Sequence, residues 1–145
     1  MSDCPFCLIG RGEVDGDLVA HRSPNVFVVP ALMQRANNPG HTLVLPVEHV
    51  TGLDTAGPAL LGEVFNVTAA VVAGVRAAFG AVGSTIVQNN DAPGQVLHHL
   101  HVGVIPRFPD DGYRVPEPAL FEGPRSVRAE QAAALRRVLT GPSLG

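Results

Sequence analysis

The first third of the chain alternates short apolar stretches with turn residues, a pattern typical of β-strands. Residues 18–21 and 25–29 are β-type stretches, and Ser23-Pro24 between them is a turn signal. Residues 30–40 carry two prolines, two asparagines and a glycine, which favours a loop. A third β-type stretch follows at residues 41–45 and ends at Pro46. The sequence therefore predicts three short strands before residue 50.

After residue 57 the apolar spacing changes to that of a helix with one buried face. Asp54 or Thr55 is placed to cap this helix, Pro58 suits its first turn, and Gly80 and Gly83 end it. The positions expected to face the core are Leu61, Val64, Phe65, Thr68, Val71, Val72, Val75 and Phe79. The spacing predicts one long helix between two groups of strands.

The last third of the chain contains two more β-type stretches and a second helical pattern. The β-type stretches are residues 84–88 and 96–105, and residues 108–125 are Pro-rich and irregular. Residues 128–139 have helical spacing, with arginines near the end where the helix dipole favours cations. No repeat or linker interrupts the chain. We therefore predict a single α+β domain over residues 1–145, with an antiparallel sheet of about five strands, one long helix and a C-terminal helix in an extension over 108–145.

Composition and charge narrow the function classes. The net charge is −3 and no block of Lys or Arg occurs, so the chain lacks the basic surface that nucleic-acid binding requires. A few local donors suffice for a small anionic substrate. The most apolar run, residues 64–78, is broken by Asn66, Gly74 and Arg76, and we expect no membrane span. The N-terminus lacks the pattern of a signal peptide, and we expect a cytoplasmic protein.

Residues 94–107, GQVLHHLHVGVIPR, carry the strongest chemical signal. On a strand, His99, His101 and Gly103 share one face, whereas the opposite face is mostly apolar and is expected to pack on the long helix. Paired histidines can be metal ligands, acid–base partners, or a nucleophile with its neighbour, because a neutral imidazole near pH 7 serves in each role. A core histidine bonded to the backbone is the alternative without a function.

The two cysteines of the chain, Cys4 and Cys7, have C-x-x-C spacing. This spacing suits a metal or a redox pair better than a disulfide framework. The redox reading is weak, because Cys-Pro-Phe-Cys does not open a helix after a strand. Two thiolates would supply half of a tetrahedral zinc site. We therefore expect residues 1–16 to form a zinc-knuckle-like segment.

Three segments together resemble those of the histidine triad (HIT) family. Residues 94–107 are similar to the family's Gly-Gln, three-residue spacer and His-φ-His-φ-His-φ-φ pattern, followed by Pro-Arg. Residues 38–49, NPGHTLVLPVEH, are similar to its earlier Pro-Gly-His-φ-φ-φ-φ-Pro-x-x-His strand. Residues 4–7, CPFC, are similar to the C-x-x-C of many bacterial members. The resemblance covers most of residues 4–107 and implies the HIT-like fold.

The resemblance also implies roles for individual residues. His101 would attack the α-phosphorus of a nucleotide, and water would then release the nucleotide from a nucleotidyl-histidine intermediate. His99 is the first histidine of the triad, and His41 lies in the neighbourhood that holds the nucleophile in one tautomer. The substrate-binding positions implied are Gly94, Gln95, Gly103, and Gln88 or Asn89.

For zinc and for assembly, the resemblance implies two further features. Bacterial members with the cysteine pair complete a structural zinc site with two histidines, which correspond here to Cys4, Cys7, His49 and His99. A zinc-bound His99 would not also act as an acid or base. Members of the family are commonly homodimers, and the apolar long helix is compatible with an interface. Ordinary core packing explains the same helical periodicity.

Two positions depart from the family pattern. The third triad position is Gly103, and losing one preorganised donor can cost about two to three orders of magnitude in rate. His98 does not replace it, because a strand would point His98 to the opposite face. The second departure lies in residues 28–37, where many members place an acidic residue that contacts the ribose. No Asp or Glu occurs there, which leaves Gln34 and Arg35 as polar candidates.

Three functions follow from these residues. The leading hypothesis is an enzyme, a nucleotide hydrolase or nucleotidyl transferase acting on nucleoside phosphoramidates or dinucleoside polyphosphates. Gly103 and the missing acidic residue motivate a second hypothesis, a nucleotide-binding protein with little turnover. The third is a metal-held structural or regulatory protein with an empty cleft. A covalent nucleotide on His101 would distinguish the enzyme from the other two.

Overall fold

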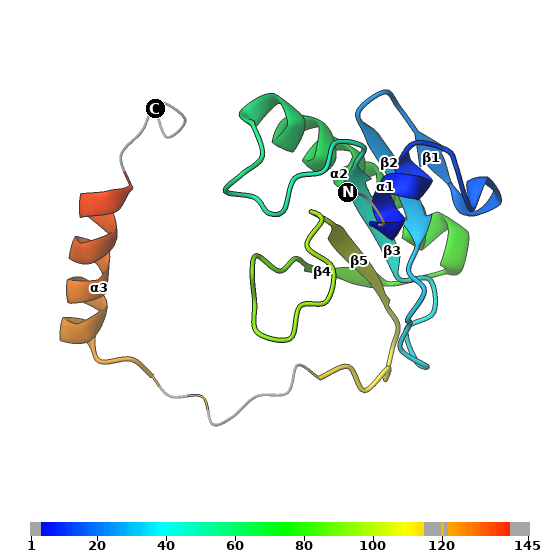
Figure 1. Cartoon of the computed structure of the whole chain (residues 1–145). Coiled ribbons are helices and arrows are strands. Elements are labelled where there is room, and N and C mark those ends of the chain that lie inside the picture. The colour runs from blue at the N-terminus through cyan, green and yellow to red at the C-terminus, as the bar shows by residue number, and fades with distance from the viewer. Residues whose placement is uncertain (1–3, 115–119, 121, 140–145) are drawn as a thin grey trace. The chain divides into compact units, whose positions relative to one another are not determined.

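The structure, a computed structural model, describes residues 4–114, 120 and 122–139. The chain divides into two compact units, Met1–Tyr113 and Arg114–Gly145 (Figure 1). The elements of the first unit are α1 (Pro5–Gly10), the 3₁₀ helix η1 (Gly16–Leu18), β1 (His21–Arg22), β2 (Val26–Pro30), β3 (Thr42–Pro46), α2 (Pro58–Phe79), β4 (Gly83–Val87) and β5 (Val102–Arg107). The strands form one antiparallel sheet in the order β1-β2-β3-β5-β4, so the predicted α+β class is confirmed.

The sheet is covered on both faces, and residue alternation along the strands decides which side chain meets which helix. On one face α2 packs on a cluster formed by Val26, Val28, Val44, Val64 and Val102. On the other face α1 packs on a cluster formed by Phe6, Phe27, Val29, Ala31, Leu43 and Leu45. Figure 1 shows α1 in front of the strands and α2 behind them. The short N-terminal helix and the long helix are therefore on opposite faces.

The long helix begins and ends close to the predicted positions, but its cap and its buried face differ. Gly57, not Asp54 or Thr55, is the N-cap, because a residue before proline is held in extended backbone and Pro58 opens the helix. Its C-cap, Gly80, adopts a left-handed φ of 72°. The expectation that Phe65 and Phe79 face the core is wrong, since they are 43% and 48% exposed. The buried positions of α2 are Val64, Thr68 and Val75.

Judged by length and hydropathy alone, α2 is long and apolar enough to cross a membrane, with a mean hydropathy of 1.6 in its most apolar window. One such helix is weak evidence, because the core helix of a folded domain meets the same criteria. In this structure one side of α2 lies against β3 and β5. Only 17% of that window is buried, however, so much of the apolar surface of α2 is left uncovered.

The histidine segment is less regular than predicted. Strand β5 begins at Val102, whereas a strand over residues 96–105 was expected. Strand β5 pairs with β3 only through residues 102–104, although β3 continues to Pro46, and β4 ends at Val87, opposite Gly103. The amide of Leu100 instead donates to the carbonyl of Val50. The alternation still holds from His101 onward, because Val102 packs in the cluster with α2 whereas His101 and Gly103 line the cleft on the other face.

The second unit contains α3 (Arg125–Val138), which begins three residues earlier than predicted and has no buried residue. Arg136 and Arg137 lie in its last turn, as expected for cations near the helix C-terminus. Residues 115–119 and 121 of the predicted irregular stretch lie outside the described residues.

Asp111 ties the loop after β5 to the loop before β3. Its carboxylate accepts hydrogen bonds from the Arg107 guanidinium, at 2.6 and 3.0 Å, and from the Asn38 side-chain amide at 2.8 Å. Two backbone amides, those of Phe108 and Tyr113, donate to it as well. The Arg107 guanidinium, followed by the Tyr113 amide, holds the pKa of Asp111 far below its usual range.

We expect Asp111→Asn to lower the melting temperature by several degrees near pH 7, because an amide donor would face groups that all donate. The folded-state pKa is lowered, so the stabilisation is fully present above the unfolded pKa, about 4, and is lost as the pH falls through the folded value. The difference from wild type should therefore shrink in acid. Thermal unfolding between about pH 7 and pH 2 measures it, with the exposed neighbour Asp110→Asn as control. A pH-independent difference would contradict this account.

Candidate active site and metal centre

A cleft of about 800 Å³ opens on the face of the sheet that α1 covers. Its walls are mostly apolar and come from α1, η1, β2, β3 and the segment before β5. The principal wall residues are Pro5, Phe6, Ile9, Leu18, Val29, Ala31, Leu43, Val96 and Leu97. The polar side chains in the lining are Asp15, His41, Gln88, Asn89 and His101. An apolar cavity with a few polar groups is suited to a small organic ligand with a polar end.

His101 lies in the cleft just before β5. Its Nδ1 is 2.7 Å from the His99 carbonyl oxygen, so Nδ1 carries the proton and donates to that carbonyl. The lone pair is then on Nε2. The resemblance placed His41 in the neighbourhood that sets this tautomer, whereas the structure gives the hydrogen bond to the main chain. The Phe6 ring, 5.5 Å from the imidazole between centroids, packs against it. The imidazole of His101 is thus held in one orientation, with Nε2 free of a hydrogen bond to the described residues.

His41 precedes β3 and lies beside His101. Burial, together with the nearby charges of His101 and Arg35, lowers the pKa of His41, so its imidazole is neutral near pH 7. Its Nε2 is buried and has no hydrogen-bond partner among the described residues. A buried polar atom without a partner costs free energy unless something binds it. The His41 nitrogen therefore marks a point where a ligand atom would be stabilised.

Gly103 faces the cleft from the middle of the sheet, between Leu43 of β3 and Val87 of β4. A Cβ atom at this position would lie 2.6 Å from His41 Nε2 and 2.9 Å from Val87 Cγ2. The imidazole of His41 thus occupies the space into which a side chain at the third triad position would project. A glycine is required because His41 lies directly over its Cα.

We expect Gly103→Ala to destabilise the protein by about 1–3 kcal/mol, because His41 or Val87 must move to admit the methyl group. Gly103→His should be worse and should not raise activity, since it displaces His41 instead of adding a donor. Thermal melts of both variants measure the effect. The control is Gly62→Ala on α2, which meets nothing within 4 Å and should stabilise slightly. A Gly103→His protein as stable as wild type would contradict this reasoning.

The other expected substrate-binding positions differ in whether they line the cleft and in whether their side chains are already hydrogen-bonded. Gln88 and Asn89 both line the cleft, but the Gln88 amide is bonded to Asn89 and Asn90. The Asn89 side chain has no hydrogen-bond partner among the described residues. Gln95 bonds within its own loop, to the Ala92 amide and the Leu97 carbonyl, and neither it nor Gly94 lines the cleft. Asn89 is therefore the amide free to contact a ligand.

The predicted metal ligands come together behind the cleft. The ligand atoms of Cys4, Cys7, His49 and His99 all lie within 4.8 Å of one another. Cys7 Sγ is 3.2 Å from His49 Nδ1, and Cys4 Sγ is 3.5 Å from His99 Nδ1. Tetrahedral zinc with ordinary bond lengths separates sulfur and nitrogen ligands by about 3.5 Å. This cluster could hold a metal ion without rearrangement.

The surroundings of the cluster also fit a metal. His99 Nε2 is 2.9 Å from the Pro46 carbonyl and donates to it, which leaves the Nδ1 lone pair for a cation. Burial lowers the pKa of His99, and burial, together with Cys4, raises the pKa of Cys7. A bound cation would offset the cost of ionising these adjacent thiols. His99 is fully buried in this cluster and does not line the cleft, so its position is that of a ligand, not of an acid or base.

The sequence analysis missed two cleft residues. Phe6, between the two cysteines, packs against both His99 and His101 and joins the metal cluster to the cleft wall. Asp15, held at a left-handed φ of 52°, brings a carboxylate to the cleft from the N-terminal loop, although residues 28–37 contain none. The C-x-x-C spacing pointed to the position of Phe6, but no local pattern indicated Asp15.

Comparisons with known proteins agree with this architecture. The chain is 33% identical over 112 residues to an uncharacterized HIT-like protein of Methanocaldococcus jannaschii, covering 75% of this chain and 82% of that protein. It is 29% identical over 113 residues to the adenylylsulfatase HINT3 of Arabidopsis thaliana, covering 73% of this chain and 53% of the relative. The chain therefore spans about half of that plant protein.

Solved structures match as well, and a family model covers most of the first unit. SMU.412c of Streptococcus mutans superposes with a TM-score of 0.83 at 27% identity, over 97% of this chain and 87% of that one. A zinc-bound histidine triad family protein of Mycobacterium smegmatis superposes with a TM-score of 0.68 at 26% identity, over 79% and 84%. The model of the HIT domain matches residues 13–110. The chain thus belongs to the HIT, or histidine triad, family.

Proposed function

We propose that this protein is a nucleotide hydrolase or nucleotidyl transferase that acts at the α-phosphate through a nucleotidyl-His101 intermediate. Membership of the HIT family supports a nucleotide-related function. A relative carries the name adenylylsulfatase, which denotes cleavage beside an adenylyl phosphate. The observation that carries the proposal is the orientation of His101, whose Nδ1 is engaged and whose Nε2 is left to react in the cleft.

The chemistry proceeds in two steps. The lone pair of His101 Nε2 forms a bond to the α-phosphorus, and the bond from phosphorus to the leaving group breaks with its electron pair. A water molecule then attacks the same phosphorus, the N–P bond breaks, and the nucleoside monophosphate is released. The apolar walls formed by Phe6, Leu18 and Leu97 would hold the base. Asn89 would contact the phosphate oxygens at the polar end of the cleft.

Turnover of two substrates tests the proposal. The purified protein should release AMP from adenosine 5′-phosphoramidate or from diadenosine tetraphosphate, as measured by chromatography of the products. If the folded, zinc-containing protein releases AMP from neither substrate, the hydrolase proposal for these substrates is wrong.

A second candidate function is a nucleotide-binding protein with little turnover, and Gly103 is the observation that favours it. The third triad position contributes no side-chain donor to the developing charge on phosphorus, a loss that costs about two to three orders of magnitude in comparable sites. Binding of AMP without covalent labelling of His101 by any substrate would select this candidate over the enzyme.

We also propose that the ion held by Cys4, Cys7, His49 and His99 is zinc in a structural role. Four protein ligands leave no position open for substrate or water, as in closed structural zinc sites. When bound, zinc would supply only a cross-link between α1, the chain after β3 and the segment before β5. The donor set and the zinc-bound relative of known structure support this assignment.

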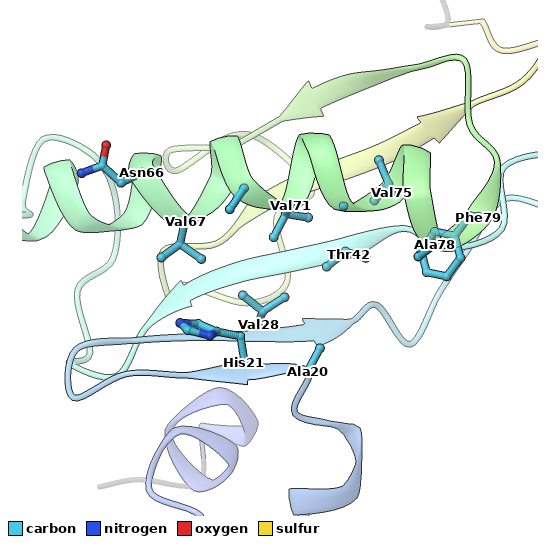
Figure 2. A pocket seen from close by; sticks show the side chains of 12 residues that line it. Ala20, His21, Val28, Thr42, Asn66, Val67, Val71, Val75, Ala78 and Phe79 are labelled. Carbon is cyan, nitrogen blue, oxygen red and sulfur yellow. The ribbon is translucent and has the colours of Figure 1, made fainter.

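A homodimer is the assembly we propose for this chain. A groove of about 510 Å³ separates α2 from β1, β2 and β3, and Figure 2 shows side chains from both sides lining it. No carboxylate, lysine or arginine lines it, and much of the surface of α2 is uncovered. A second copy across a two-fold axis would bury this apolar surface.

Sedimentation should give a dimer, and Ala70→Glu in the groove should dissociate it, whereas Ala69→Glu outside the groove should not. A monomeric wild type would contradict the proposal.

A further inference from the structure

A second, smaller cavity lies next to the main cleft. It has a volume of about 490 Å³ and shares Met33, His41, Val87 and Asn89 with the cleft, so the two lie on either side of these residues. Along β5 the cleft is lined by Gly103 and the second cavity by Ile105, which faces the same side. Two residues of a strand advance about 7 Å. The second cavity therefore begins about one strand step beyond Gly103.

The second cavity carries a cation that is not neutralised. Arg35 and Arg107 both stack on the Tyr113 ring, each with its guanidinium carbon 4.4 Å from the ring centroid. Arg107 is paired with Asp111, whereas Arg35 has no carboxylate within 4.0 Å among the described residues. Stacking on Tyr113 restricts the Arg35 side chain, and Arg35 itself lines the cavity. The cavity thus contains a held positive charge.

The remaining lining favours an anion over a base or a cation. No carboxylate lines the cavity, and among its lining side chains the His41 Nε2 atom, the Asn89 amide and the Tyr113 hydroxyl form no hydrogen bond with the described residues. The main cleft differs, because its walls are largely apolar and suit the flat face of a base. The His41 and Asn89 side chains line both cavities. A ligand that extends from the cleft into the second cavity would therefore pass these two side chains.

We propose that the second cavity is a subsite for a polyphosphate leaving group, with Arg35 as its principal ligand. This inference rests on the proposed function and narrows its substrates to nucleotides whose α-phosphate carries a chain of further phosphates, such as dinucleoside polyphosphates. When His101 Nε2 bonds to the α-phosphorus, the bridging P–O bond breaks and its electron pair stays on the departing phosphate chain. Arg35 stabilises that charge. An amine leaving group needs a proton instead, which Arg35 does not supply.

Kinetics on two substrates test the subsite. Arg35→Gln should lower kcat/KM for diadenosine tetraphosphate about tenfold or more, the effect of losing a charge-assisted contact. The same variant should change kcat/KM for adenosine 5′-phosphoramidate by less than about twofold, because that leaving group makes no such contact. Arg76→Gln on α2 is the matched control and should leave both values unchanged. An equal loss on both substrates, or no loss on the tetraphosphate, would overturn the subsite.

Measuring nucleotide binding without turnover tests the subsite independently of the proposed hydrolase activity. In a His101→Ala background, where no covalent chemistry occurs, calorimetry gives the dissociation constants of AMP and ATP. With Arg35 present, ATP should bind about tenfold more tightly than AMP, because its phosphate chain reaches the subsite. With Arg35→Gln the two constants should become nearly equal. If the ratio does not depend on Arg35, the subsite is wrong even if the protein is a hydrolase. If the ratio behaves as expected without any turnover, only the proposed hydrolase is wrong.

Discussion

Replacing His101 with alanine should lower kcat/KM for the nucleotide substrate by at least about 10⁴-fold, as loss of a covalent nucleophile does in other enzymes. The reason is geometric. Among the histidines of the site, His99 is buried at the metal cluster and His41 has its Nε2 buried over Gly103. His101 is the histidine that reaches the cleft with its Nδ1 already engaged and its Nε2 left to react.

Two further variants make this result specific to the nucleophile. His101→Gln keeps a donor near the His99 carbonyl and should be equally inactive, which separates loss of chemistry from loss of structure. His98→Ala removes an exposed histidine beside Asp91, outside the cleft, and should retain activity. Mass spectrometry after an alkaline denaturing quench should find the nucleotidyl group on wild type and not on His101→Ala. Substantial turnover by His101→Ala would remove this residue from the nucleophile role.

Removing the zinc ion that we propose at Cys4, Cys7, His49 and His99 should have the largest effect on stability. A ligand present at a thousandfold above its dissociation constant stabilises the folded state by about 4 kcal/mol. For a unit of about 100 residues this corresponds to a fall in melting temperature of about 15 °C or more on chelation. Helix α1 has six residues, too few to persist in isolation, and it depends on Cys7 and Phe6 to hold it on the sheet. Loss of α1 should also open the cleft and lower activity.

The measurements are zinc content by elemental analysis and thermal melts before chelation, after chelation and after zinc is restored. Cys7→Ser should reproduce the chelated state, and chelator should then have no further effect on it. Using the wild-type protein with chelator keeps the test valid even if the variant folds poorly. A melting temperature that does not respond to a chelator strong enough to remove zinc would contradict a structural zinc site.

Much of the fold could be predicted because its signals are local. The β-type stretches of β2, β3 and β4 and the helical spacing of α2 each depend on neighbours within a few residues, and all four were placed within about two residues. The errors occurred where tertiary contacts override local pattern. Residues 96–101 alternate like a strand, yet they do not join the sheet, and the amide of Leu100 donates instead to the carbonyl of Val50 in the chain after β3. Phe65 and Phe79 have helical core spacing, yet both side chains are largely exposed in the folded unit.

The candidate site likewise has residues that the sequence could predict and residues that it could not. The spacing of His99 and His101 and of the two cysteines, read with the family resemblance, was enough to list the metal cluster and the nucleophile. The sequence by itself could not show that the imidazole of His41 fills the space over Gly103, because 62 residues separate them along the chain. The same holds for Asp15 at the cleft and for Arg35 stacked on Tyr113 beside the second cavity.

The sequence by itself predicted most of the helices and strands, and its histidine and cysteine spacing, together with the resemblance to the HIT family, indicated the candidate nucleophile and metal ligands. Only the tertiary structure showed that the four ligand atoms converge, that His101 Nδ1 is bonded to the main chain, and what lies on either side of His41. Those assignments depend on packing between β3, β5 and the loops around them. The physical reason is that the burial and the electrostatic environment of a side chain depend on every segment of the chain that packs near it. A sequence pattern describes only one segment at a time.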